Sequence, residues 1–143
     1  MYTFGKQEHL CSNSLIGRLY HSGHRLILFP YSIHWMPVRQ DALPDGVPLQ
    51  VMIVTSKKKI HHAVDRNRIK RLTRECYRLH KPELHSFLHD HDTAIVLSIS
   101  YIHNSILGYS TLYHKFDKLI PLLIEDISHK LLTNDETAVG QPL

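Results

Sequence analysis

The run from Thr93 to Ser100 constrains the fold more than any other part of the chain, because every residue in it is apolar or small. Its length is that of a strand, and the lack of regular polar alternation is typical of a strand covered on both faces. Such a strand needs paired neighbours and packed layers above and below it. We therefore predict that it lies at the centre of a sheet.

Three further strands are expected before it. Segments rich in β-branched and apolar residues predict strands over Leu26–Phe29, Ile33–Val38 and Leu49–Thr55. Pro37 cannot donate a hydrogen bond within a sheet, so we expect an edge position or a strand end there. The Leu49–Thr55 strand is expected to be buried.

Helices are expected at both ends of the chain. Ser12 or Asn13 can cap a first helix that ends before Gly23. A last helix should begin at Ser110, and Pro121 should kink or divide it. These elements predict an α+β protein, a compact α/β sandwich with helices packed on a small mixed sheet. We expect one domain over residues 1–132 and a disordered tail over residues 133–143.

Positive charge is concentrated in one segment. The 143 residues carry a formal net charge of +4. Ten Lys or Arg residues and two acids lie between Lys57 and Lys81, whereas the rest of the chain has seven basic and eleven acidic residues. A basic patch on a neutral-to-acidic body is typical of a protein that binds a polyanion.

The basic segment should form a helix that is capped by Asp65 and stopped near Leu79 by Pro82. Cations cover most of its surface and repel one another at i,i+4 spacing, which lowers helix stability. An anionic partner would relieve this repulsion, and the alternative is a solvated face without a partner. Helical periodicity predicts a buried stripe made of Ile69, Leu72, Cys76 and Leu79.

The segment Arg66–Glu75 (Arg-Asn-Arg-Ile-Lys-Arg-Leu-Thr-Arg-Glu) resembles the signature helix of the bacterial ribonuclease P protein family. Val54–Lys58 is similar to the strand end that precedes that helix, and Leu15–Tyr20 with Gly23 is similar to the family's first helix. The resemblance implies a left-handed strand-helix-strand crossover around the basic helix. Without it, a right-handed crossover would be expected.

The resemblance also implies a function. The chain would be the protein subunit of ribonuclease P, which removes the 5′ leader of precursor tRNA by magnesium-dependent endonucleolytic cleavage. The partner RNA and its Mg²⁺ ions would carry out the catalysis, so no protein side chain is expected to be catalytic and no metal ligand is assigned. The expected partners are the catalytic RNA and precursor tRNA, in the cytoplasm, with no membrane and no obligate protein partner.

Two groups of site residues follow from the resemblance. The catalytic RNA would be contacted by Lys57, Lys58, Lys59, Arg66, Asn67, Arg68, Lys70, Arg71 and Arg74. The 5′ leader would lie between the first helix and the sheet, against Ile16, Tyr20, and Phe29 or Tyr31. Aromatic side chains suit this role because they stack on unpaired bases. Core packing is the alternative role for Ile16 and Tyr20.

Other chemistry is disfavoured. Cys11 and Cys76 are expected to be free thiols. His85 and His89 have the spacing of a helical zinc pair, but the accompanying ligands are missing. The rival functions are an RNA-binding module without a role in tRNA processing and a helix-turn-helix DNA regulator, which needs a second helix directly before the basic one.

Overall fold

The computed structural model describes residues 6–140, with side chains as far as Leu131. In this range the chain forms two short 3-10 helices, η1 (Lys6–Glu8) and η2 (Gln40–Ala42), which flank the first helix and hairpin. The α-helices and strands follow in the order α1 (Asn13–Ser22), β1 (His24–Leu28), β2 (Tyr31–Val38), β3 (Leu49–Thr55), α2 (Ala63–Asp90), β4 (Ala94–Tyr101) and α3 (Tyr109–Gly140).

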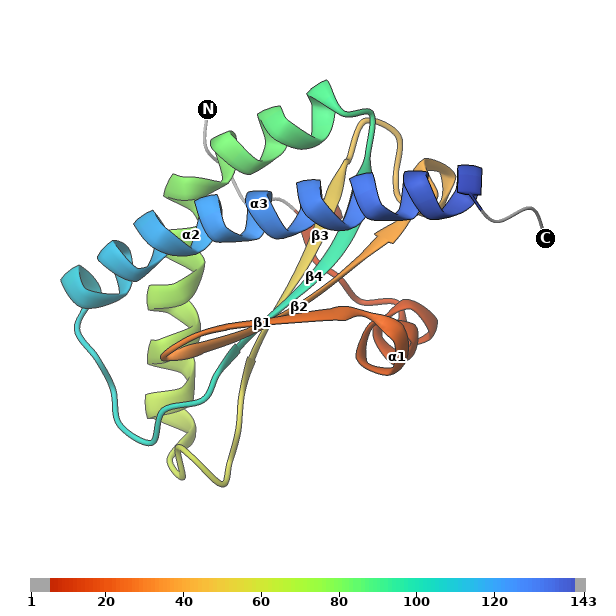
Figure 1. The fold of residues 1–143 in the computed structure, drawn as a ribbon. Coiled ribbons are helices and arrows are strands. Elements are labelled where there is room, and N and C mark those ends of the chain that lie inside the picture. The colour runs from red at the N-terminus through yellow and green to blue at the C-terminus, as the bar shows by residue number, and fades with distance from the viewer. Residues whose placement is uncertain (1–5, 141–143) are drawn as a thin grey trace.

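The four strands form one mixed sheet in the order β1-β2-β4-β3. The strand pairs β1–β2 and β2–β4 are antiparallel, whereas β3 and β4 are parallel. Helix α1 covers one face of the sheet, and α2 and α3 cover the other (Figure 1). The predicted α/β sandwich and the interior position of β4 are confirmed. The left-handed sense of the β3-α2-β4 crossover stays a prediction.

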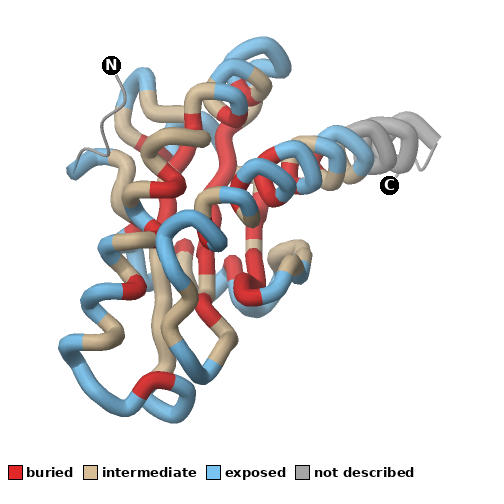
Figure 2. Tube along the Cα trace, turned by 90° about the vertical axis from the view of Figure 1, so that its left-hand side faces the viewer, coloured by how far each residue is buried: buried red, intermediate tan, exposed pale blue. Residues whose placement is uncertain are grey.

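Alternation along β4 divides the core into two parts. Ile95, Leu97 and Ile99 belong to the large cluster under α2 and α3, whereas Ala94 and Val96 belong to the smaller cluster under α1. Successive side chains of a strand point to opposite faces, so β4 contributes to both clusters. Figure 2 shows buried positions along the strands and on one side of each helix.

The expected strand end at Pro37 is confirmed, because Pro37 lies near the end of β2, beyond the residues that pair with β1. No β1 backbone therefore needs its missing N–H. Other features differ from the prediction. β3 is an edge strand with only two fully buried side chains, Leu49 and Val51, because the neighbouring β4 occupies the interior. Ser110 lies inside α3, which starts at Tyr109 and continues through Pro121 as a single helix.

The predicted tail, residues 133–143, stays a prediction. The backbone of α3 is helical as far as Gly140, so helix extends into the range for which disorder was expected. Residues 141–143 lie outside the described part of the chain.

Helix α2 is longer than its sequence predicts. It passes through Pro82 and ends at Asp90 instead of stopping near Leu79. A proline inside a helix removes one hydrogen bond and usually bends the helix, and Figure 1 shows α2 changing direction along its length. The second half persists because Leu84 and Leu88 are completely buried, which offsets the missing hydrogen bond. Asp65 lies in the first turn and does not cap the helix, since His62 occupies that position.

The buried face of α2 is also turned relative to the predicted stripe. Ile69 and Cys76 are buried as expected, but Thr73 and Tyr77 are buried with them. The hydroxyl of Thr73 shares a 2.8 Å hydrogen bond with the hydroxyl of Tyr31, which satisfies both buried groups. The predicted Leu72 and Leu79 are only half-buried. The prediction used only apolar residues to locate the buried face of the helix. It therefore left out Thr73, which can be buried because its hydroxyl is hydrogen-bonded inside the core.

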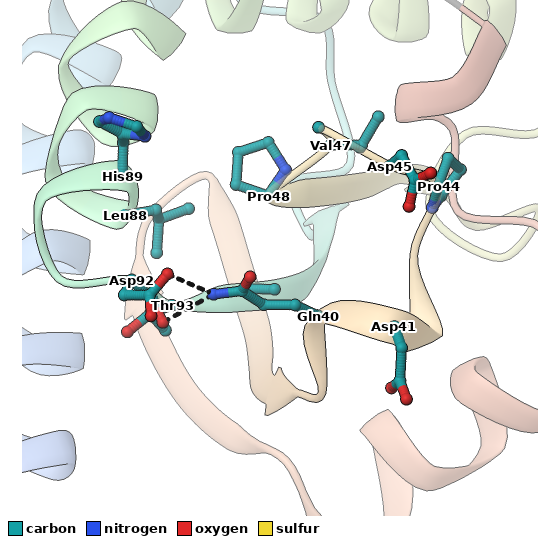
Figure 3. A pocket seen from close by; sticks show the side chains of 12 residues that line it. Gln40, Asp41, Pro44, Asp45, Val47, Pro48, Leu88, His89, Asp92 and Thr93 are labelled. Carbon is teal, nitrogen blue, oxygen red and sulfur yellow. Dashed lines mark hydrogen bonds between the residues drawn. The ribbon is translucent and has the colours of Figure 1, made fainter.

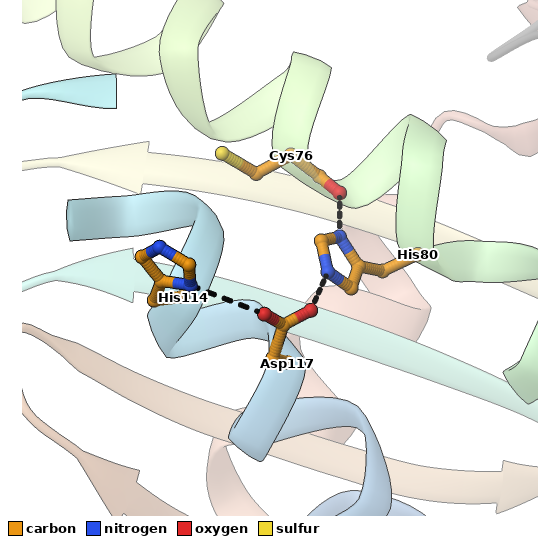
Figure 4. Close-up of polar contacts among 4 residues, drawn as sticks. All are labelled: Cys76, His80, His114 and Asp117. Carbon is orange, nitrogen blue, oxygen red and sulfur yellow. Dashed lines mark hydrogen bonds and ion pairs between the residues drawn. The ribbon is translucent and has the colours of Figure 1, made fainter. Parts of the chain in front are cut away.

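A polar cluster joins α2 to α3. Nδ1 of His80 lies 2.7 Å from the carbonyl oxygen of Cys76, and Nε2 lies 2.7 Å from Oδ1 of Asp117 (Figure 4). His114 approaches the second carboxylate oxygen at 3.3 Å. The hydrogen bond from His80 is the main reason that the pKa of Asp117 is lowered.

Helix α3 is also bonded to the sheet. Its Asp126 accepts a 2.7 Å hydrogen bond from the indole of Trp35 in β2.

The turned face of α2 predicts unequal effects of two leucine truncations. Leu84→Ala should lower the free energy of unfolding by about 2–5 kcal/mol, because a completely buried side chain leaves a cavity. Leu72→Ala should have a clearly smaller effect because its site is partly open to water. Urea denaturation measures the free energy of unfolding of both variants. A larger loss of this free energy for Leu72→Ala would contradict the observed buried face and support the one predicted from periodicity.

Candidate functional site

The loop between β3 and α2 presents three exposed lysines, Lys57, Lys58 and Lys59. The guanidinium of Arg66 fixes this loop, since its Nη1 donates hydrogen bonds of 2.9 and 2.8 Å to the carbonyl oxygens of Ile60 and His61. Arg66 is half-buried as a result. It therefore has a structural role in the loop, and its contact with RNA stays a prediction.

The first half of α2 continues this positive surface. Asn67, Arg68, Arg71 and Arg74 are exposed, and Lys70 is half-buried beside them. Within residues 6–131, no carboxylate forms an ion pair with Arg68, Arg71 or Arg74. We call the exposed set the basic surface, and it consists of Lys57, Lys58, Lys59, Asn67, Arg68, Arg71 and Arg74.

One arginine of α2 is neutralised. Arg78 makes a bidentate contact with Glu75, with donor–acceptor distances of 3.0 and 2.6 Å. This hydrogen bonding is the first cause of the lowered pKa of Glu75. The pair borders the basic surface. It leaves uncompensated the charge of Arg68, Arg71 and Arg74, which we call the outer arginines.

A shallow pocket of about 590 Å³ lies where the basic surface meets the start of α3. Its walls are mostly arginine side chains, with one aromatic ring contributed by α3. The lining residues are Arg68, Arg71, Leu72, Arg74, Glu75, Arg78 and Tyr109. We call it the arginine pocket.

The opposite face of the sheet carries the predicted first-helix residues. Ile16 is half-buried, and Tyr20 keeps 44% of its surface exposed. The hydroxyl of Tyr20 shares a 2.6 Å hydrogen bond with Ser98, and its ring lies 4.9 Å from the imidazole of His34, centroid to centroid. Tyr20 is thus held in place but partly open, whereas Ile16 packs against the smaller core cluster.

His34 is a residue of this face that sequence reasoning missed. Its Nδ1 is buried without a hydrogen-bond partner in the described part of the chain. Burial, followed by the nearby charge of Arg25, lowers the pKa of His34. The neutral form of the ring is therefore favoured, and its Nδ1 atom is shielded from solvent. Alternation along β2 could have placed His34 on the face opposite Trp35, but nothing in the sequence indicates that Tyr20 lies against it.

The two other predicted leader residues do not join Tyr20. Phe29 is 51% exposed, but it lies in the β1–β2 turn, at the end of β1 remote from α1 (Figure 1), and its ring contacts His103 at 4.9 Å. Tyr31 is completely buried on the α2 face, and burial raises its pKa. Tyr31 is therefore not part of an accessible surface, because strand alternation sends its side chain to the same side as Ile33 and Trp35.

A second pocket, of about 360 Å³, lies near the end of α2 (Figure 3). Asp41, Asp45 and Asp92 line it, and Nε2 of Gln40 donates to both the backbone and the side chain of Asp92, at 2.9 and 2.8 Å. Three carboxylates would repel phosphate groups, so this pocket is unsuited to nucleic acid.

The described residues contain no group of three or more His, Cys, Asp or Glu side chains arranged to hold a metal ion. His85 instead lies 3.6 Å from Glu8, which forms a buried ion pair with Lys81. Cys11 and Cys76 are both free, as predicted. Over the described residues, every helix is too short or too polar to span a bilayer.

The known proteins that this chain resembles belong to one family. The family model described as Ribonuclease P matches residues 4–119. The chain is 44% identical over 72 residues to the ribonuclease P protein component of Chlorobaculum tepidum, a match that covers 48% of the chain but only 44% of that relative. It is 24% identical over 135 residues to the ribonuclease P protein component of Porphyromonas gingivalis, covering 93% and 96% of the two chains.

Solved structures resemble this fold as well. The RNase P protein of Staphylococcus aureus superposes with a TM-score of 0.63 at 19% identity, covering 82% of this chain and 96% of that one. The RNase P protein of Thermotoga maritima gives a TM-score of 0.56 at 15% identity, covering 79% and 94%. At such low identity these structures establish the shared fold alone.

The uncompensated charge of α2 predicts how RNA affinity depends on single arginines. Arg71→Ala should weaken binding to a structured RNA and reduce the salt dependence of the affinity by about one counterion per lost phosphate contact. Arg39→Ala is the matched control, because Arg39 is also exposed but pairs with Asp41, which lines the pocket near the end of α2. Fluorescence titrations at several salt concentrations measure the RNA affinity of both variants and its salt dependence. Equal losses of affinity in the two variants would mean that only the net charge of the protein matters, and not the position of Arg71.

Proposed function

Because the chain belongs to the ribonuclease P protein family, we propose that it is the protein subunit of that enzyme. It binds a catalytic RNA and the 5′ leader of precursor tRNA in the cytoplasm, and the assembled complex removes the leader by magnesium-dependent endonucleolytic cleavage. The hydrolysis is carried out by RNA and its bound metal ions. The protein side chains bind and position the two RNAs.

The observation that carries this proposal is the basic surface. Its arginines and lysines are exposed and lack acidic partners within the described residues, while the opposite side of α2 is buried in the core. A rigid array of unpaired guanidinium groups suits the phosphates of a folded RNA, because each guanidinium can form a bidentate contact. We assign the catalytic RNA to this surface.

The leader is assigned to the opposite side of the molecule. Tyr20 offers an exposed ring that is fixed by Ser98, and the ring of His34 packs beside it. An exposed aromatic ring that is held in place can bind an unpaired base by stacking. The sheet between the two surfaces would keep the catalytic RNA and the leader apart.

Magnesium enters this proposal through the RNA. When bound there, Mg²⁺ activates the attacking water and stabilises the leaving oxygen. The basic surface neutralises nearby phosphates, which reduces the number of free cations that the folded RNA requires. The protein thus lowers the magnesium demand of the complex.

Reconstitution tests the proposal. Full-length protein should cleave nothing by itself, but it should lower the Mg²⁺ concentration at which a bacterial ribonuclease P RNA processes precursor tRNA. An Arg68→Ala/Arg71→Ala double variant should lose most of this shift, whereas Arg39→Ala should retain it. A protein that binds RNA with the expected salt sensitivity but leaves the magnesium requirement unchanged would instead be an RNA-binding module without a role in tRNA processing.

The leader assignment has its own test. Tyr20→Ala should weaken binding of precursor tRNA to the reconstituted complex, because one aromatic stack is lost, while affinity for mature tRNA stays the same. Tyr20→Phe keeps the ring and loses the Ser98 hydrogen bond, so it should lie between the wild type and Tyr20→Ala. Equal effects of Tyr20→Ala on both tRNAs would show that this face does not bind the leader.

A further inference from the structure

The arginine pocket contains an aromatic ring that the basic segment does not supply. Tyr109 is the first residue of α3, and 39% of its surface is exposed. It lies far in sequence from Arg68, Arg71 and Arg74, but its side chain lines the same pocket. The pocket therefore combines guanidinium groups from α2 with a phenol ring from α3.

The position of Tyr109 is fixed by the loop that precedes it. The hydroxyl of Tyr101 donates a 2.7 Å hydrogen bond to the carbonyl oxygen of Ser105 and accepts a 3.1 Å hydrogen bond from the backbone N–H of Leu107. The first turn of α3 then closes with a bond from Leu112 to Gly108. These bonds tie the loop to the end of β4 and close the first turn of α3, so the backbone of Tyr109 is already ordered before a ligand binds.

The ring has support on its inner side. The centroid of the Tyr113 ring lies 5.9 Å from that of Tyr109, one helical turn further along α3. A tyrosine hydroxyl is neutral at physiological pH, and partial burial of Tyr109 raises its pKa further. A neutral, supported ring with an exposed surface can serve as a stacking platform.

The charges around the ring define the ligand. Glu75 is occupied by Arg78, so the charges of Arg68, Arg71 and Arg74 are available to an anion. The volume lies within the usual range for small-ligand pockets, about 300–1,000 Å³. Arginines beside an aromatic platform suit a group with one planar and one anionic part, which describes a nucleotide.

We propose that the arginine pocket binds one unpaired nucleotide of the catalytic RNA, with its base stacked on Tyr109 and its phosphate held by the outer arginines. This inference rests on the proposed function and adds a specific recognition site to an otherwise electrostatic surface. A bulged or looped base enters the pocket, whereas a base within a duplex stays stacked on its neighbours. An acidic peptide would pair with the arginines but would leave the ring of Tyr109 without a planar partner.

Binding of the full-length protein to a bacterial ribonuclease P RNA tests the site. Tyr109→Ala and Tyr109→Leu should each weaken binding by about 5- to 150-fold, the range expected for the loss of one stacked base. Tyr109→Phe should bind as the wild type does. The salt dependence of the affinity should be the same in all of these variants, because none changes charge, whereas Arg71→Ala should reduce it.

A crosslink identifies the nucleotide directly. With a photoreactive benzoylphenylalanine in place of Tyr109, irradiation should join the protein to one nucleotide that is unpaired in the RNA. Leu122→Ala, which truncates another exposed side chain of α3 outside the pocket, should leave binding unchanged. Circular dichroism should show equal helix content in every variant.

The outcomes separate this inference from the proposed function. If the wild type lowers the magnesium requirement but Tyr109→Ala binds equally well, the nucleotide site is wrong and the proposed function stands. Crosslinks confined to paired nucleotides would overturn the site in the same way. If the wild type leaves the magnesium requirement unchanged, the proposed function fails irrespective of Tyr109.

Discussion

Burial of one face of α2 is the constraint on which the rest of the structure depends. Ile69, Thr73 and Tyr77 enter the large core cluster or line it, and the hydrogen bond between Thr73 and Tyr31 fixes how the helix is rotated on the sheet. Once that rotation is set, Arg68 and Arg71 must point to solvent. The like charges that destabilise the isolated helix are tolerated because burial of the other face contributes more free energy.

The layered arrangement then gives the molecule two different faces. On one side, the basic surface and the start of α3 surround the arginine pocket. On the other side, Tyr20 of α1 keeps an exposed ring beside His34 of β2. Because α1 and α2 cover opposite faces of one sheet (Figure 1), two RNA segments can be held without competing for the same side chains.

The sequence was sufficient for the features that rest on local patterns. The strand run before Tyr101, the cap at Ser12 and the concentration of cations all lie where expected. Features that depend on packing between distant segments could not be predicted from the sequence. Nothing local indicates that Pro82 is tolerated inside α2, since the compensation comes from Leu84 and Leu88 in the core.

The site was predicted to a similar extent. Arg68, Arg71 and Arg74 were found from charge density and resemblance, and their exposure agrees with a binding role. Tyr31 was misplaced because an aromatic residue in a strand gives no sign of which face it occupies until the register is known. Tyr109 gave no signal at all, because its place beside Arg71 depends on how α3 packs against α2.

The separation of the two faces can be measured directly with a tethered cleavage reagent. In a Cys11→Ser background, which removes the exposed native thiol, iron-EDTA is attached to a cysteine introduced as Asn67→Cys or as Tyr20→Cys. In the reconstituted complex with precursor tRNA, the probe on α2 should cut the catalytic RNA, and the probe on α1 should cut the 5′ leader. Cleavage of the same RNA segment from both positions would contradict the two-faced arrangement.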